Sequence, residues 1–207
     1  MQMLKLLRGA LLLLLLGSMP VLAKNPLMAP AADQNPKPEP GKALLVFLRP
    51  SAMGGMYSST VYDAPDEATR FLGVVNYKHR LAVQMTPGQH RMMVVGENAD
   101  FVDVTLDADK TYYLLVRPRP GFGKYRFSLL PLHNRADAEY SLLADYFKEW
   151  MDKTHYVSKT PAADAWYEEH KDSVAQKKAD YLIKWNKMLP QDRAPLVLNA
   201  DDGVPAR

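Results

Sequence analysis

The chain has 207 residues, of which 47% are hydrophobic and 24% charged, and its formal net charge is +3. This length allows one domain, or one domain with an appendage, and the composition is that of a chain that can bury a core. The sequence contains no cysteine, which excludes disulfides, a thiol nucleophile and a lipid-bearing cysteine behind a leader.

Residues 1–23 predict a secretory signal peptide. Lys5 and Arg8 form a positive n-region, and residues 10–16 form an apolar h-region that contains six consecutive leucines. Small residues follow at the positions that signal peptidase reads, so we expect cleavage after Ala23. The alternative is an uncleaved anchor, but the apolar run is far shorter than the roughly 20 residues that span a bilayer.

Export would place the mature chain outside the cytoplasm, and removal of the leader changes its net charge. Loss of Lys5 and Arg8 with the leader leaves 24 basic against 23 acidic residues, a formal charge of +1. Such a balance argues against a nucleic-acid partner. A chain without disulfides must be held together by its core. We therefore expect a periplasmic or secreted protein with no transmembrane span after cleavage.

The mature chain is expected to begin with a proline-rich tether at residues 24–41. Five prolines fall within this stretch and few large apolar side chains accompany them. Proline fixes φ and removes a backbone donor, which favours an extended conformation.

Residues 42–132 show the period-two alternation of β-strands. The clearest strands are expected at 44–48, 81–85, 102–106 and 125–129, and weaker ones at 59–62, 71–75, 91–95 and 112–116. Pro87-Gly88 favours a type II turn, and Asp107–Asp109 predicts another turn. Because no helical segment separates the strands, the pattern favours an antiparallel β-sandwich, Ig-like or prealbumin-like, over an α/β fold.

The hydrophobic period becomes helical after Pro131 and predicts a two-helix appendage at residues 135–189. The first helix is expected around residues 136–150. The second is expected to begin with Thr160 as N-cap and Pro161 at its first position, and to end before Pro190. Residues 190–207 are expected to form a flexible tail.

Three stretches carry a recognisable pattern: KALLVFLRPS at 42–51, LAVQMTPGQHRMMVV at 81–95 and VDVTLDADKTYYLLV at 102–116. Together they resemble the exported bacterial family known as domain of unknown function 2846, over about residues 42–132. This resemblance implies a non-catalytic β module located in the cell envelope. It implies no substrate and no catalytic residues.

The sequence offers little evidence for catalysis or for a cofactor. None of the five histidines is paired at a metal-ligand spacing. Several methionines lie near His90, and thioethers bind Cu(I), but the positions of Met85 and Met93 on strand faces favour a role in the core. No serine lies in a nucleophile elbow. We therefore expect no catalytic residues, no metal and no cofactor.

The best candidate for a binding site is the segment from Arg117 to Lys124. Arg117, Arg119 and Lys124 supply three cations, Phe122 supplies one aromatic ring, and prolines stiffen the backbone between them. Arginine offers planar donors that match carboxylates and phosphates. The alternative is an ordinary solvated hairpin loop. The segment predicts contact with an anionic partner.

The predicted function is that of a non-catalytic periplasmic or envelope module that binds a protein or a polymer, or serves a structural role. One alternative is a hydrolase or an accessory subunit of an envelope enzyme, which should show a cleft with perturbed titratable groups. Another is a glycan-binding module, which needs solvent-facing aromatic rings. Trp166, Tyr167 and Trp185 are candidates for such rings, although helical spacing favours the core for Trp166 and Trp185.

Overall fold

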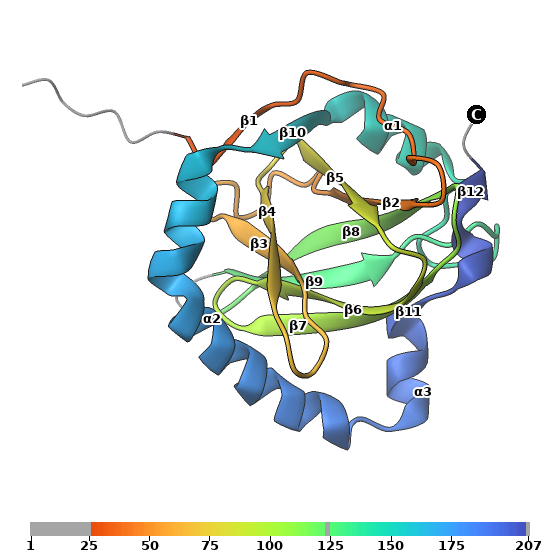
Figure 1. The fold of residues 1–207 in the computed structure, drawn as a ribbon. Coiled ribbons are helices and arrows are strands. Elements are labelled where there is room, and N and C mark those ends of the chain that lie inside the picture. The colour runs from red at the N-terminus through yellow and green to blue at the C-terminus, as the bar shows by residue number, and fades with distance from the viewer. Residues whose placement is uncertain (1–25, 123–124, 206–207) are drawn as a thin grey trace, which may run out of the picture.

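The computed structural model describes residues 26–122 and 125–205, so the predicted leader, its cleavage site and Lys124 lie outside the described residues. The fold is mainly β, with two sheets and a few helices (Figure 1). The strands are β1 (Met28–Pro30), β2 (Ala43–Leu48), β3 (Ser59–Asp63), β4 (Arg70–Val75), β5 (His79–Met85), β6 (Gly88–Val95), β7 (Ala99–Leu106), β8 (Lys110–Pro120), β9 (Tyr125–Pro131), β10 (His155–Lys159), β11 (Val197–Leu198) and β12 (Val204–Pro205). The helices are α1 (Asp145–Lys153), α2 (Pro161–Lys187) and α3 (Pro190–Arg193), with 3-10 turns η1 (Ala194–Leu196) and η2 (Ala200–Asp202).

Both sheets are mixed, which corrects the expectation of a purely antiparallel sandwich. Sheet A has the order β1-β10-β5-β2-β8-β12, with β9 also paired to β8, and sheet B has the order β11-β7-β6-β3-β4. Strand β8 runs parallel to β2, β10 parallel to β5, and β11 parallel to β7. These parallel neighbours are far apart in the chain, so local alternation gives no information on their direction. Over the described residues the sheets stay open and form no closed barrel.

All eight strands that the alternation predicts are confirmed, as β2 to β9. Both predicted turns contain a residue with positive φ: Gly88 takes a φ of 123° after Pro87, and Asp109 takes a φ of 61° between β7 and β8. Gly88 is also the first residue of β6, whose register on β7 is continuous from Gly88 to Val95. The two turns connect strands of different sheets, β5 of sheet A to β6 of sheet B and β7 of sheet B to β8 of sheet A.

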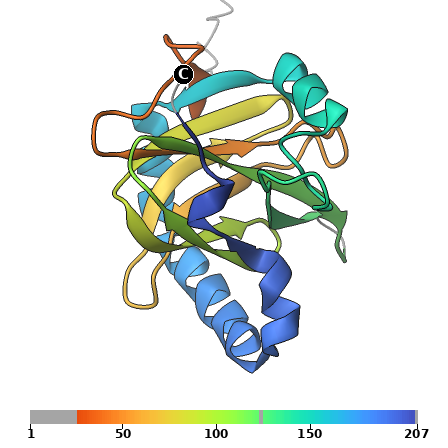
Figure 2. The same cartoon turned by 90° about the vertical axis from the view of Figure 1, so that its right-hand side faces the viewer.

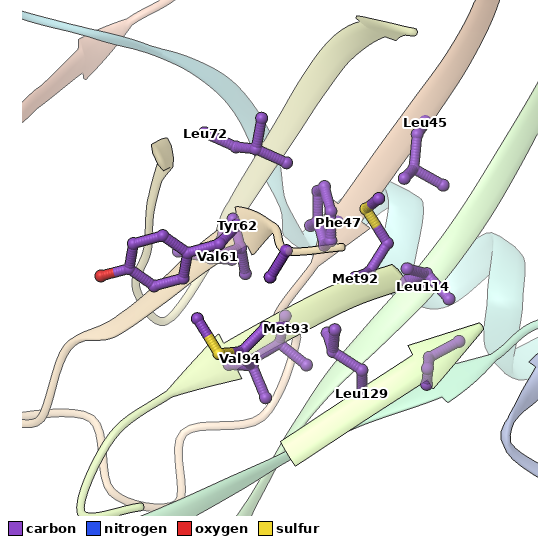
Figure 3. Close-up of a cluster of buried hydrophobic side chains, with 14 of the residues drawn as sticks. Leu45, Phe47, Val61, Tyr62, Leu72, Met92, Met93, Val94, Leu114 and Leu129 are labelled. Carbon is purple, nitrogen blue, oxygen red and sulfur yellow. The ribbon is translucent and has the colours of Figure 1, made fainter. Parts of the chain in front are cut away.

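The main core lies between the two sheets. Phe47 and Leu114 of sheet A face Met92 of sheet B, whereas Tyr62 points to the opposite side of sheet B (Figure 3). Each of these side chains is fully buried. Burial of such apolar groups contributes about 1.5–3 kcal/mol for each large side chain. Sheet B therefore has two buried faces.

Helix α2 covers the outer face of sheet B (Figure 1). The rings of Tyr181 and Trp185 pack edge-on against Phe101, with centroid distances of 5.0 and 5.7 Å. The helix begins as predicted, with Thr160 as N-cap and Pro161 in the first turn. The Thr160 hydroxyl donates to the carbonyl of Pro26 at 2.7 Å instead of capping the helix. This bond ties the helix start to the N-terminal segment.

The outer face of sheet A is covered by helix α1 and by an extended segment, residues 31–40, which we call the strap. The strap lies in the stretch expected to be a tether, yet two hydrogen bonds between Gln34 and the backbone of Tyr156 hold it on the sheet. Gln34 Oε1 accepts from the amide of Tyr156 at 2.9 Å, and Gln34 Nε2 donates to the Tyr156 carbonyl at 3.0 Å. Strand β1, just before the strap, pairs with β10. Proline-rich composition indicated an extended backbone here but not its docking.

The segment after Leu189 also differs from the flexible tail that was expected. Strand β11 pairs with β7 of sheet B, and β12 pairs with β8 of sheet A. Leu198 is fully buried, and the Asp202 carboxylate, which is 6% exposed, lies 3.0 Å from Nδ1 of His133. Helix α1 and helix α3 lie at opposite ends of the molecule in both views (Figures 1 and 2). No helix among the described residues is long and apolar enough to cross a membrane.

Candidate functional site

Most of the predicted loop is part of a strand. Residues 117–120 belong to β8 and pair with β9, from Arg117 opposite Ser128 to Pro120 opposite Tyr125. Beyond Leu115, β8 pairs only with β9, so the missing amide donors of Pro118 and Pro120 are tolerated there. The connection between the two strands is limited to residues 121–124.

The structure brings together two of the four predicted site residues. Arg117 and Arg119 are two positions apart on β8 and line one half-open cavity of about 440 Å³, which we call the hairpin groove. Phe122 is 95% exposed at the tip of the hairpin and does not line the groove. Lys124 lies outside the described residues. The candidate site is therefore the side of the hairpin and not its tip.

The groove also contains side chains that the sequence did not assign to it. Helix α1 supplies Trp150 and Lys153, and Tyr140 comes from the loop before that helix. Lys153 forms an ion pair with Glu149 on the exposed face of α1. The i, i+3 spacing of Trp150 and Lys153 places them on one helix face. Nothing in the sequence shows that this face lies beside β8.

The two arginines of the groove have different partners. Arg119 Nη2 lies 3.1 Å from Oδ2 of Asp100, a carboxylate that is only 6% exposed. Such a buried carboxylate needs a counter-ion, so Arg119 has a structural role. Arg117 Nη1 donates to the hydroxyl of Tyr140 at 2.7 Å and forms no ion pair with a described carboxylate. Arg117 therefore lines the groove without a direct ion pair among the described residues.

Tyr140 links this guanidinium to a carboxylate. Burial raises the pKa of Tyr140, as does a hydrogen bond to the side chain of Glu139. The phenol consequently keeps its proton at neutral pH while its oxygen accepts from Arg117. A ligand oxygen in the groove therefore meets the guanidinium of Arg117. Guanidinium groups recognise carboxylates, sulfates and phosphates.

A cavity of about 760 Å³ lies beside β6 and β7, and most of the charged side chains that line it are paired with one another. Nδ1 of His90 lies 3.3 Å from Oδ2 of Asp63, and Nε2 lies 2.9 Å from the carbonyl of Thr86. Arg91 Nε donates to Asp103 at 2.8 Å. Because both ring nitrogens of His90 are engaged, the ring has no free nitrogen to act as a general base.

The structure also places the methionines considered for Cu(I) binding and the aromatic rings considered for glycan binding. Met85 and Met93 are buried in the main core. Trp185 is fully buried, and Trp166 stacks on His170 with a centroid distance of 4.3 Å. In the part of the chain that the structure describes, no three histidine or carboxylate side chains gather in a way that could hold a metal ion.

No model of a known protein family matches the chain, and no curated protein matches it either. The resemblance to domain of unknown function 2846 therefore stays a prediction that rests on the three quoted stretches.

Proposed function

We propose that this chain is a non-catalytic binding module of the bacterial cell envelope, exported by its leader and released into the periplasm. It binds an anionic envelope polymer or an acidic protein surface through the hairpin groove. The proposal includes membership of the domain of unknown function 2846 family and a prealbumin-like arrangement of the two sheets. It draws on the leader sequence, the motifs at residues 42–116 and the groove.

One observation carries the proposal, namely that Arg117 forms no direct ion pair with a described carboxylate. Arg119 neutralises Asp100 and Lys153 pairs with Glu149, whereas Arg117 bonds only to a phenol within the described residues. The strand backbone and Tyr140 fix the guanidinium before a ligand arrives. Prior fixing of a donor reduces the entropy lost on binding.

A glycan is a second candidate ligand, because aromatic rings line the same groove. Tyr140 and Trp150 stand beside Arg117, and the ring of Trp150 packs against Tyr146 with a centroid distance of 4.6 Å. Aromatic faces stack on apolar ring surfaces while cations contact acidic substituents. An acidic polysaccharide of the envelope combines both features.

The test is co-sedimentation of the purified chain with isolated cell envelopes at several salt concentrations. Arg117→Ser should reduce envelope association several-fold and make the remaining association less dependent on salt, because one ionic contact is lost. Arg126→Ser is the matched control: Arg126 is exposed on β9 and does not line the groove. Arg119→Ser is avoided because it also removes the counter-ion of Asp100.

Equal association of the wild type and Arg117→Ser would overturn the groove as the binding site. N-terminal sequencing of the native protein tests the export step separately, since cleavage should leave Lys24 as the first residue. A native protein that begins with Met1 and fractionates with the cytosol would overturn the envelope location.

A further inference from the structure

Sheet A buries a second arginine that lacks a charged partner. Arg80, on the outer face of β5, is 8% exposed and forms no ion pair with any described carboxylate. Its Nη1 donates to the carbonyl of Met151 at 2.7 Å, and its guanidinium lies 4.3 Å from the ring centroid of Tyr156. Its Nε is fully buried and has no hydrogen-bond partner, as is also true of Nε of the buried Arg49, so the difference between the two arginines lies in their terminal nitrogens. An unpaired buried charge is costly to stability.

The other buried arginine shows what a purely structural arrangement looks like in this fold. Arg49 uses both terminal nitrogens, with Nη1 donating to Tyr57 and Nη2 to Gly54, each at 2.7 Å. Backbone carbonyls of the loop that follows β2 thus accept hydrogen bonds from both terminal nitrogens of the Arg49 guanidinium. At Arg80 only Nη1 has protein partners, both from Met151, and Nη2 has none among the described residues. Arg80 therefore keeps donor capacity that the protein does not use.

Arg80 lines a cavity of about 500 Å³ on the outer face of sheet A, which we call the strap pocket. Tyr113 and Tyr156 lie with Arg80 on the sheet, the strap closes one side, and helix α1 supplies Phe147 and Met151. The volume falls within the usual range for small-molecule sites, roughly 300–1,000 Å³. The lining of the pocket is about equally polar and apolar: Arg80 lies on its sheet side, Lys37 lies on the strap, and the apolar side chains of α1 form the opposite wall.

Two phenols lie among the polar side chains that line the pocket. No described residue forms a hydrogen bond with the hydroxyl of Tyr113 or that of Tyr156, and neither oxygen is among the fully buried atoms without a partner. Burial raises the pKa of Tyr113 to about 12, and burial also raises the pKa of Tyr156. Both phenols are therefore neutral donors at physiological pH. They stand near Arg80 and add donors without adding charge.

We propose that the strap pocket binds a small amphiphilic carboxylate, with its head on Arg80 and the two phenols and its apolar body against helix α1. The free Nη2 of Arg80 matches a carboxylate oxygen, and Phe147 and Met151 offer an apolar surface to the rest of such a ligand. The site is separate from the hairpin groove and does not depend on the function proposed for that groove.

Isothermal titration calorimetry of the purified chain with octanoate and 4-phenylbutyrate tests this proposal. Octanamide and 4-phenylbutyramide are the matched neutral probes. The carboxylates should bind, and the amides should bind at least about tenfold more weakly, because a hydrogen bond to a charged group contributes about 1.5–3 kcal/mol. Equal affinity of acids and amides, or no binding of either carboxylate, would overturn the proposal.

The variant Arg80→Met separates a ligand-binding role from a structural role. Methionine keeps much of the volume and removes the unpaired charge, so the variant should be at least as stable as the wild type while losing carboxylate binding about tenfold or more. A variant that still binds octanoate as the wild type does would contradict the proposal. A strongly destabilised variant would also contradict it, because Arg80 would then be structural.

Two further variants keep the test independent of folding and of the groove. Tyr113→Phe removes one donor from the strap pocket and should weaken octanoate binding several-fold with little change in stability. Arg117→Ser should leave octanoate binding unchanged, because Arg117 lines only the hairpin groove. Weaker octanoate binding by Arg117→Ser would assign the carboxylate to the groove instead.

Discussion

The hydroxyl of Tyr181 donates a hydrogen bond of 2.6 Å to Oδ1 of Asp100. Asp100 lies on β7, and its other oxygen pairs with Arg119 of β8. Burial raises the pKa of Tyr181, as does the neighbouring carboxylate, so the phenol remains the donor. Through one carboxylate, helix α2, sheet B and sheet A are held together.

We expect Tyr181→Phe to lower the free energy of unfolding by about 1–3 kcal/mol, because the buried carboxylate loses a donor and no water replaces it easily. Urea denaturation measures this loss. Tyr167→Phe is the matched control, since the Tyr167 hydroxyl makes only a 3.3 Å bond to the neutral carbonyl of Thr69. Equal losses of unfolding free energy for the two variants would show that the hydrogen bond to Asp100 contributes no more to stability than the bond of Tyr167.

Arg49 is expected to hold the loop at residues 50–58 in place. Burial lowers the pKa of Arg49 to about 10, so it stays charged at neutral pH and donates to the carbonyls of Tyr57 and Gly54. Arg49→Met should leave these carbonyls unpaired and make the loop the first site of cleavage in limited proteolysis. Arg49→Lys, which keeps the charge and some donors, should be cleaved more slowly. Unchanged cleavage of both variants would contradict this role.

The pair of His90 and Asp63 predicts a dependence of stability on pH. Its hydrogen bond to Asp63 raises the pKa of His90, although burial opposes the shift. Burial alone would raise the pKa of Asp63, but the contacts with His90 and Arg70 together hold it below its usual range. Protonated His90 therefore stabilises the fold fully below its unfolded pKa of about 6.5, and this contribution is lost as pH rises through the folded pKa.

The difference in unfolding free energy between the wild type and His90→Gln should thus be larger at pH 5.5 than at pH 8. The contribution of ionised Asp63 is present above its unfolded pKa of about 4 and is lost as pH falls through its lower folded value. Urea titrations at four pH values measure both limbs. His170→Gln, at an exposed position, is the control. A difference that grows with pH would refute the assignment.

Leu198 tests whether the C-terminal segment is part of the core. Its side chain is fully buried, whereas that of Leu189 is 55% exposed. Leu198→Ala should cost about 2–5 kcal/mol in unfolding free energy, and Leu189→Ala should cost less than about 0.5 kcal/mol. Thermal denaturation compares the two variants directly. Similar small losses would mean that the segment is a dispensable tail, as its sequence first indicated.

Much of the fold was predictable because the signal for each of these strands lies within the strand's own sequence. The alternation at β2 to β9 reflects which faces are buried, and Pro87-Gly88 carries its own turn geometry. The placement of β10 was not predictable. Its five residues lie between two helices and pair in parallel with β5, some 75 positions earlier. Long-range pairing of a short segment leaves no periodic signal.

The candidate site was predictable only in part, for a related reason. Arginine chemistry singled out Arg117, and the structure leaves that residue facing a groove. The same reasoning could not show that Arg119, unlike Arg117, has a structural ion pair, because its partner Asp100 lies on another strand. Arg80 gave no signal at all, because an arginine at an alternating strand position is usually solvent-exposed. Only the docking of the strap and α1 over sheet A buries it.

The pairing of β11 with sheet B and of β12 with sheet A has a consequence for biogenesis. A chain still held at its carboxyl end by a ribosome or a translocation channel lacks an edge strand in each sheet. Sheet B gains its edge strand only when residue 198 is free to pair, and sheet A gains β12 only when residue 205 is free, so both sheets are completed late in synthesis.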